Sequence, residues 1–347
     1  MRSVKSYQAS SNSNLISMQQ PLTARRSAGI SGRVKVPGDK SISHRALILA
    51  GLATGRTRIE GLLQADDVLA TARAVQALGA TVSQDGEVYE VLGQGVGGLS
   101  APDGVLDFGN SGTASRLMLG VLAGYPMHVS LTGDASLCRR PMSRVLKPLE
   151  QMGLLVEDNK ETLPLTVVGT EDLLPIEYEL PVPSAQVKSA ILLAGLHAPG
   201  RTTVIEALPT RDHTERMLRY FGAEVDVAIR ADGSRAITVA GDAELRGAHV
   251  VVPGDPSSAA FLVAAALICP GSELVIETVL LNPTRTGFFE TLQEMGADIT
   301  VLDQRDAAGE SVGDLQVRWS ALKGVRVPSE RAPSMIDEYP ILAALAA

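Results

Sequence analysis

The chain repeats a unit of about 72 residues, and this repeat constrains its fold more than any other feature. Each copy has a short apolar run, a turn rich in Pro, Gly, Asp and Ser, a helix of small apolar residues, a Gly break and a second apolar run. The full pattern is found at residues 34–62, 178–208 and 250–280. Two further segments, 107–122 and 332–347, keep the turn and the helix. Because solenoid repeats usually have about 20–45 residues, we expect α/β subdomains grouped around shared cores.

Two sets of equivalent positions support this period. The turns are marked by Asp39, Asn110, Ser184, Ser257 and Met335, which are spaced 71, 74, 73 and 78 residues apart. Amphipathic patterns end in glycine at Gly79, Gly153, Gly222 and Gly296. Because glycine readily adopts the left-handed conformation that ends a helix, each is predicted to stop a helix before a strand.

Composition excludes several classes of protein. The formal net charge of −8 disfavours a nucleic-acid binder but allows a small anionic substrate in a locally basic cleft. The two cysteines, Cys138 and Cys269, form no disulfide or metal-binding pattern. The longest strongly apolar run, 259–269, is much shorter than the about 20 residues that cross a membrane. Residues 1–22 are interpreted as a disordered cytoplasmic tail, with an organelle transit peptide as the alternative.

Positively charged residues recur where helices are predicted to begin. A helix N-terminus carries free N–H groups and partial positive charge, so cations are disfavoured there. Nevertheless, cations stand at four predicted helix starts. Lys40 and Arg45 lie at the first, and Arg139, Arg140 and Arg144 surround Pro141, a candidate first helical residue, at the second. Arg211 lies at the third, and Arg285, after Pro283, at the fourth. The pattern indicates a cleft where a bound phosphate or carboxylate supplies the missing negative charge.

The sequence disfavours ATP and NAD as ligands. The segment Gly38-Asp39-Lys40-Ser41 ends like a phosphate-binding loop, but Asp39 stands where that motif requires glycine. The glycines at 93, 95, 97 and 98 are followed by Leu-Ser-Ala-Pro rather than by a helix, so they do not form a dinucleotide-binding turn.

Several long motifs, in order along the chain from about Thr23, resemble those of the 5-enolpyruvylshikimate-3-phosphate synthase family, in its class II bacterial form. They are PGDKSISHRALILAGLATG, DFGNSGTASRLMLG, CRRPMSRVLKPLEQMG, PSAQVKSAILLAGL, TRDHTERML, VPGDPSSAAFLVAAAL and SMIDEYPILAALAA. The resemblance implies transfer of the enolpyruvyl group of phosphoenolpyruvate to the 5-hydroxyl of shikimate 3-phosphate, with release of phosphate, in chorismate and aromatic amino acid biosynthesis. It also implies an α/β fold of two domains built from βαβαββ units: residues 39–252, and residues 23–38 with 253–347.

The resemblance assigns substrate-binding residues. Those matching shikimate 3-phosphate contacts are Lys40, Ser41, Arg45, Ser184, Ala185, Gln186 and Arg211. Gly112 and Arg140 match the phosphoenolpyruvate pocket, with Asn110 and Thr113 beside it, and Lys40 also reaches phosphoenolpyruvate. Asp337 matches the carboxylate that takes the proton of the 5-hydroxyl, and Lys40 is the second catalytic candidate. No metal or organic cofactor is implied, and glycine at position 112 is expected to make the enzyme sensitive to the inhibitor glyphosate.

Local structural roles remain as alternatives for several of these residues. Ser334 and Asp337 have the spacing of a capping box, and Ser184 fits a helix N-cap. Asn110 fits turn chemistry, and His44 and His213 are interpreted as structural hydrogen-bonding residues.

The sequence also departs from the family pattern, because it stops within the fifth repeat. The expected consequences are a stable first half and a second half in which Leu342, Leu345 and much of the helix at 257–268 lack cover. The chain alone would then be inactive. The alternatives are thus an inactive relative that binds shikimate 3-phosphate, or a sister transferase acting on a UDP-amino sugar, which would need Lys-Asn where Lys40-Ser41 stands. We expect a cytoplasmic monomer acting on small molecules, with no nucleic-acid or membrane partner.

Overall fold

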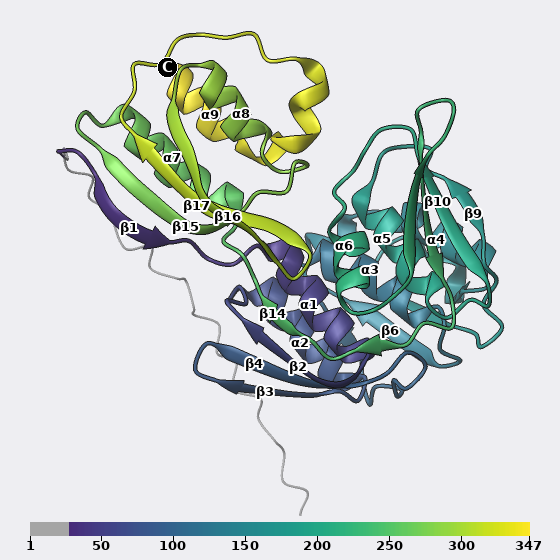
Figure 1. Cartoon of the computed structure of the whole chain (residues 1–347). Helices are drawn as coiled ribbons and strands as arrows, with labels where there is room; N and C mark the ends of the chain where they lie inside the picture. The colour runs from purple at the N-terminus through teal and green to yellow at the C-terminus, as the bar shows by residue number, and fades with distance from the viewer. Residues whose placement is uncertain (1–27) are drawn as a thin grey trace, which may run out of the picture.

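The repeat appears in the computed structural model, which describes residues 28–347, as four sheets each covered by helices (Figure 1). The tail proposed at residues 1–22 lies outside the described residues. The first sheet has β2 (Ala53–Glu60), β3 (Thr81–Asp85) and β4 (Val88–Gln94) of the first repeat, joined by β13 (Leu245–Arg246) and β14 (His249–Val251) from later in the chain, and its helices are α1 (Lys40–Leu52) and α2 (Asp66–Ala77).

The second and third repeats have matching sheets. The second has β5 (Leu106–Asp107), β6 (His128–Thr132), β7 (Leu155–Val156) and β8 (Leu165–Val168), with α3 (Gly112–Leu122) and α4 (Ser143–Met152). The third has β9 (Glu177–Glu179), β10 (Arg201–Glu206), β11 (Val225–Ile229) and β12 (Arg235–Ala240), with α5 (Ala185–Gly195) and α6 (His213–Tyr220).

The fourth sheet has β1 (Ser31–Lys35), β15 (Glu273–Leu280), β16 (Asp298–Ala307) and β17 (Glu310–Arg318), in the order β1-β15-β17-β16. Its helices are α7 (Pro256–Ile268), α8 (Gly287–Glu294) and the C-terminal α9 (Tyr339–Ala346). Two 3₁₀ turns, Ser329–Ser334 and Ile336–Glu338, precede α9. The strands of this sheet form a body beside the other three, and the hairpin of β16 and β17 reaches toward α6 (Figure 1).

The chain crosses twice between these two bodies. Strand β1 precedes α1 but pairs in parallel with β15, whereas β14 precedes α7 but pairs in parallel with β2. The two crossing segments are joined to each other, because the Asp39 N–H donates to the carbonyl of Pro253 at 2.7 Å and the Asp255 N–H donates to that of Pro37 at 2.9 Å.

Each body has its own buried apolar cluster. The larger includes α1, α3 and α5, with Leu47, Leu117 and Ile191 fully buried. The smaller lies between α7, α8 and the fourth sheet, around Val263 and Leu292. The helix stops are as the glycine pattern predicts: Gly79, Gly153, Gly222 and Gly296 have φ of 103°, 119°, 100° and 95°.

Four expectations are wrong in detail. Pro141 is not the first residue of a helix, because α4 begins at Ser143 after Met142, and Arg285 lies in a turn before α8 rather than in its first turn. The helix at 257–268 is mostly buried, since its small residues pack closely against β15 and β17 and leave Phe261 and Ile268 as its exposed large side chains. Leu342 and Leu345 are half-buried against the same cluster rather than uncovered. No helix within residues 28–347 is both long and apolar enough to span a bilayer.

Candidate functional site

Two adjoining cavities, of about 400 and 540 Å³, share Lys40, Thr113 and Gln186. The first cavity is lined from both bodies of the molecule, by Asp39, Ser41, Arg45, Ala185, Arg211, His213, Asp255, Ser257, Arg285 and Asp337 besides the shared residues. The second is lined by Asp66, Asp67, Asn110, Ser111, Gly112, Arg116 and Arg140 besides the shared residues. The structure thus brings the candidate site residues together around these two cavities, except Ser184, which borders neither cavity.

Helix N-termini from successive repeats converge on these cavities. Asp39 caps α1 by accepting from the Ile42 N–H at 2.9 Å, and Asp255 caps α7 in the same way. Ser111 caps α3, and Ser184 caps α5 by accepting from the Val187 N–H at 3.4 Å. The capping interpretation of Ser184 is confirmed. Because each repeat begins its first helix at the same place, the repeat itself brings several N-termini, with their partial positive charge, to one cleft.

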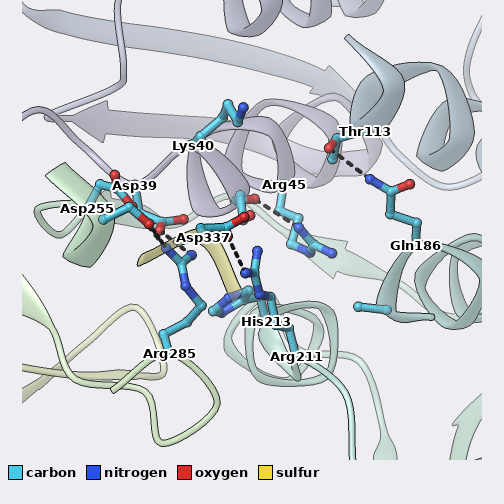
Figure 2. A pocket seen from close by; sticks show the side chains of 13 residues that line it. Asp39, Lys40, Arg45, Thr113, Gln186, Arg211, His213, Asp255, Arg285 and Asp337 are labelled. Carbon is cyan, nitrogen blue, oxygen red and sulfur yellow. Dashed lines mark hydrogen bonds and ion pairs between the residues drawn. The ribbon is translucent and has the colours of Figure 1, made fainter. Parts of the chain in front are cut away.

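Lys40 is the charged residue common to both cavities. Its side chain is 58% exposed, and its ammonium lies 3.6 Å from the Asp67 carboxylate. Figure 2 shows this side chain extending over the cavity above Asp39. An exposed lysine at this position can contact anionic groups in either cavity.

Arg45 lies deeper and is held rigidly. Its guanidinium donates to Thr214 Oγ1 at 2.7 Å, to Ser189 Oγ at 2.9 Å and to the Ser41 carbonyl at 3.0 Å. Burial lowers the pKa of Arg45 to about 10, partly offset by Glu215. Since these three hydrogen-bond acceptors are neutral, the charge of Arg45 remains available to an anion in the first cavity.

The second cavity has two arginines close together. Arg140 donates to Asn110 Oδ1 at 2.6 Å, and Arg116 donates to the carbonyls of Gly112 and Pro141, each at 3.0 Å. Burial, followed by the charges of Arg140 and Arg144, lowers the pKa of Arg116. Closely spaced cations bonded to neutral oxygens form a site for an anion.

Arg211 and Asp337 form an ion pair across the first cavity. Arg211 Nη2 lies 2.6 Å from Asp337 Oδ2, and the Asp337 side chain is 51% exposed. Figure 2 shows the two side chains pointing toward each other from separate segments. The capping-box alternative for Ser334 and Asp337 is wrong, because Ser334 Oγ donates to the Arg331 carbonyl and α9 begins after Glu338.

Sequence reasoning noted the charge of Arg285 but not its partners. Its guanidinium is buried and bonds to Asp39 at 3.0 Å and to Asp255 at 3.1 Å. Burial opposes this charge, yet the two carboxylates outweigh burial and raise the pKa of Arg285. The anion that the sequence pattern required at this position is therefore supplied by the chain.

The two histidines form structural hydrogen bonds, as expected. His44 Nδ1 lies 2.7 Å from Thr71 Oγ1, and His213 Nδ1 lies 2.8 Å from Glu310 Oε1. Asp212, His213 and Glu310 also have metal-ligand spacing, but Asn282 Nδ2 donates to both carboxylates, at 2.6 and 2.9 Å. Because the amide already satisfies these oxygens, the cluster is explained without a metal ion.

Comparisons with known proteins agree on one family. A model described as EPSP synthase (3-phosphoshikimate 1-carboxyvinyltransferase) matches residues 24–347. The 3-phosphoshikimate 1-carboxyvinyltransferase of Methylobacterium sp. (strain 4-46) is 60% identical over 336 residues, which are 95% of this chain and 75% of that protein. That of Methylorubrum extorquens is 58% identical over 332 residues, 94% of this chain and 73% of the relative. A solved EPSP synthase from Acinetobacter baumannii superposes with a TM-score of 0.85 at 44% identity, over 92% of this chain and 72% of that one.

Proposed function

The chain belongs to the EPSP synthase family and has its two-domain α/β fold, and we propose that it transfers the enolpyruvyl group of phosphoenolpyruvate to the 5-hydroxyl of shikimate 3-phosphate, releasing phosphate. The observation that supports this most directly is the pair of adjoining cavities that share Lys40. Two anionic substrates that react with each other need neighbouring basic sites, and a lysine common to both sites can contact each of them.

The first cavity fits the acceptor. Ser41 and Arg45, with Ala185 and Gln186, border it from α1 and α5, and Ser184 orders the start of α5. We assign the phosphate of shikimate 3-phosphate to Arg211. Since Arg211 is paired with Asp337, a bound phosphate would replace the carboxylate and free Asp337 to accept a proton.

The second cavity fits the donor. Arg140 and Asn110 form its rim, while Gly112 and Thr113 begin α3 beside it. The planar carboxylate of phosphoenolpyruvate suits an arginine fork, and the free N–H groups at the start of α3 suit an anion. Glycine at position 112 allows the ligand to approach the backbone closely.

The reaction follows from these positions. The acceptor oxygen bonds to C2 of phosphoenolpyruvate while its proton passes to Asp337, and C3 takes up a proton from solvent to become a methyl group. The C2–O bond then breaks with its electron pair on the leaving phosphate, and C3 returns a proton to solvent as the double bond is restored. Lys40 stabilises the phosphate as it leaves. The sequence of bonds is complete without a metal or organic cofactor.

The wider assignments belong to the same proposal. The chain acts as a cytoplasmic monomer on small molecules, and its domains are residues 39–252 and residues 23–38 with 253–347.

The test is phosphate release from phosphoenolpyruvate with shikimate 3-phosphate as acceptor, combined with calorimetric titration of that acceptor. We expect release that requires both substrates, and no release with a UDP-amino sugar. Binding of shikimate 3-phosphate without release would instead support the inactive-relative alternative. Absence of both would contradict the substrate assignment.

A further inference from the structure

Arg285 lies where three segments that line the first cavity meet. Its Nη1 bonds to Asp39 Oδ2 at 3.0 Å, and its Nη2 bonds to Asp255 Oδ1 at 3.1 Å and to Ser257 Oγ at 2.9 Å. Figure 2 shows the guanidinium directed at the two aspartates. The side chain is only 4% exposed, so these contacts are shielded from water.

One group of contacts holds the chain crossings. Asp39 and Asp255 cap α1 and α7, and the backbone N–H of each donates one of the two bonds that join the crossing segments. Burial acts to raise the pKa of Asp39, but Arg285 and His213 outweigh it, so that pKa lies below its ordinary value. Because Asp39 is charged and immediately precedes Lys40, Arg285 fixes the start of the helix that carries Lys40.

The other contact leads to Asp337. Ser257 Oγ accepts from Arg285 and donates its own proton to Glu338 Oε1 at 2.5 Å. Glu338 is buried, whereas the adjacent Asp337 extends into the cavity. Since one hydroxyl serves as acceptor and donor, Arg285 orders the turn of Asp337 through Ser257 and Glu338.

We propose that Arg285 is a positioning residue for enolpyruvyl transfer: it fixes the segment of Lys40, on one body, relative to the segment of Asp337, on the other. The inference rests on the proposed function for the roles of those two residues. Arg285 Nε and Glu338 Oε2 are buried without a hydrogen-bond partner in the described structure. Purely structural clusters normally satisfy such atoms, so their retention agrees with a functional use of this one.

The geometry predicts which substitutions separate the contacts at the chain crossings from the contact that leads to Asp337. Arg285→Lys keeps the charge but has no fork to bind both aspartates and Ser257. Asp39→Asn keeps an oxygen to cap α1 but loses the ion pair. Ser257→Ala removes the hydrogen bonds that connect Arg285 to Glu338 but leaves the ion pairs of Arg285 with Asp39 and Asp255. A matched control is Arg318→Lys, because Arg318 also lies near two carboxylates, Glu273 and Asp298, but at the end of β17, where it lines neither cavity.

The first measurement is hydrogen exchange of backbone amides in the full chain without ligand. Arg285→Lys should accelerate exchange in both 40–43 and 335–339, and Ser257→Ala should do so in 335–339 alone. Asp39→Asn should affect 40–43, and Arg318→Lys neither segment. Unchanged exchange at 335–339 in both Arg285→Lys and Ser257→Ala would overturn the inference. If Arg285→Lys accelerates exchange throughout the fold, exchange in the milder variants Asp39→Asn and Ser257→Ala decides whether Arg285 orders the two segments.

The second measurement is enolpyruvyl transfer. Arg285→Lys should lower kcat on the order of 100-fold, the usual consequence of misplacing a reacting group by about 1 Å, while KM for shikimate 3-phosphate changes little. Equal kcat in Arg285→Lys and the unaltered chain would contradict positioning. Failure of the proposed function would appear differently, as absent binding and turnover in the unaltered chain, and the exchange pattern would still decide whether Arg285 joins the two segments.

Discussion

The two cavities satisfy their basic side chains in different ways. In the first, Arg211 and Arg285 bond to carboxylates of the chain, Asp337 for one and Asp39 with Asp255 for the other. In the second, Arg116 and Arg140 donate to carbonyl, amide and hydroxyl oxygens. The two arginines of the first cavity are thus paired with carboxylates, whereas the two arginines of the second are not, and the carboxylates of the second cavity, Asp66 and Asp67, lie on the side of Lys40.

This difference shows what a cation at a helix start can mean. In the second cavity it indicates a site for an external anion, as the sequence pattern suggested. In the first cavity, Arg285 pairs with carboxylates of the chain, and the ion pair of Arg211 with Asp337 must break before Arg211 can bind a ligand anion. Binding in the first cavity therefore includes the cost of breaking an ion pair, although an exchange of one anion for another keeps this cost small.

The largest expected effect is that of Asp337→Asn. Loss of the general base should lower kcat about 1,000-fold, while the affinity for shikimate 3-phosphate stays the same or rises because Arg211 no longer has a competing carboxylate. Steady-state kinetics and calorimetry would measure the two effects separately. The comparison variant is Glu338→Gln, which neutralises the adjacent buried carboxyl and leaves the Asp337 carboxylate in place. A large loss of affinity in Asp337→Asn would mean that the pair does not compete with substrate.

Lys40→Met should have the next largest effect, because it removes a charge from both cavities at once. Loss of charge-assisted contacts should cost on the order of 3 kcal/mol in transition-state binding. Both KM values should rise, unlike those of a residue confined to one cavity. Lys35→Met, on the exposed end of β1, is a suitable control. A change in kcat/KM of less than about tenfold would place Lys40 outside the reacting region.

The sequence predicted local features better than distant contacts. The helix stops at Gly79 and Gly153 and the cap at Ser184 depend on a few neighbouring residues, and all three are as expected. The repeat was sufficient to predict the sheet-and-helix units. It also brought Asn110, Gly112 and Gln186 to one region, because equivalent helix starts converge.

What could not be predicted depends on contacts between remote segments. Arg285 and Asp39 are 246 positions apart, and no local pattern indicates that they meet. The pairing of Arg211 with Asp337 joins positions 126 apart and changes the interpretation of both. The cover over the helix at 257–268 was underestimated for the same reason, since β15 and β17 supply it.

A third prediction concerns pH and the residues beneath the second cavity. Burial lowers the pKa of His44 to about 4, with Asp67 raising it and Arg45 and Lys40 lowering it. The unfolded chain, with an ordinary histidine pKa, therefore binds more protons as the pH falls below about 6.5, and stability decreases. The loss attributable to His44 should reach about 2 kcal/mol at pH 5 relative to pH 7.5.

Denaturant unfolding of His44→Gln at both pH values would measure this contribution. The variant should lose less stability on acidification, whereas His128→Gln, at an exposed site, should behave like the unaltered chain. An identical decrease in His44→Gln would assign the effect elsewhere, for example to His197, whose burial also lowers its pKa to about 4.

The smallest expected effect is that of Gly112→Ala, which acts on the second cavity alone. A Cβ at position 112 would lie 2.7 Å from Arg116 Nη1 and 3.1 Å from Arg140 Nη1. Both atoms are at the ends of flexible side chains, and Gly112 begins a helix, so the fold should accept the substitution. The added methyl group should shorten the space beside the two arginines without removing their charges.

Such a change should distinguish ligands by length. Glyphosate, which is longer than phosphoenolpyruvate, should lose about tenfold in inhibition, while KM for phosphoenolpyruvate rises by less and KM for shikimate 3-phosphate is unchanged, because a clash in one pocket leaves the other intact. Inhibition kinetics with both substrates varied in turn would measure all three values. Gly120→Ala is not a usable control, since its Cβ would meet the backbone of Ala190 at 2.2 Å, but Gly104→Ala, in open space, is. Equal inhibition of Gly112→Ala and the unaltered chain would remove position 112 from the donor pocket, and an equal rise in both KM values would mean that the two cavities do not act as separate sites.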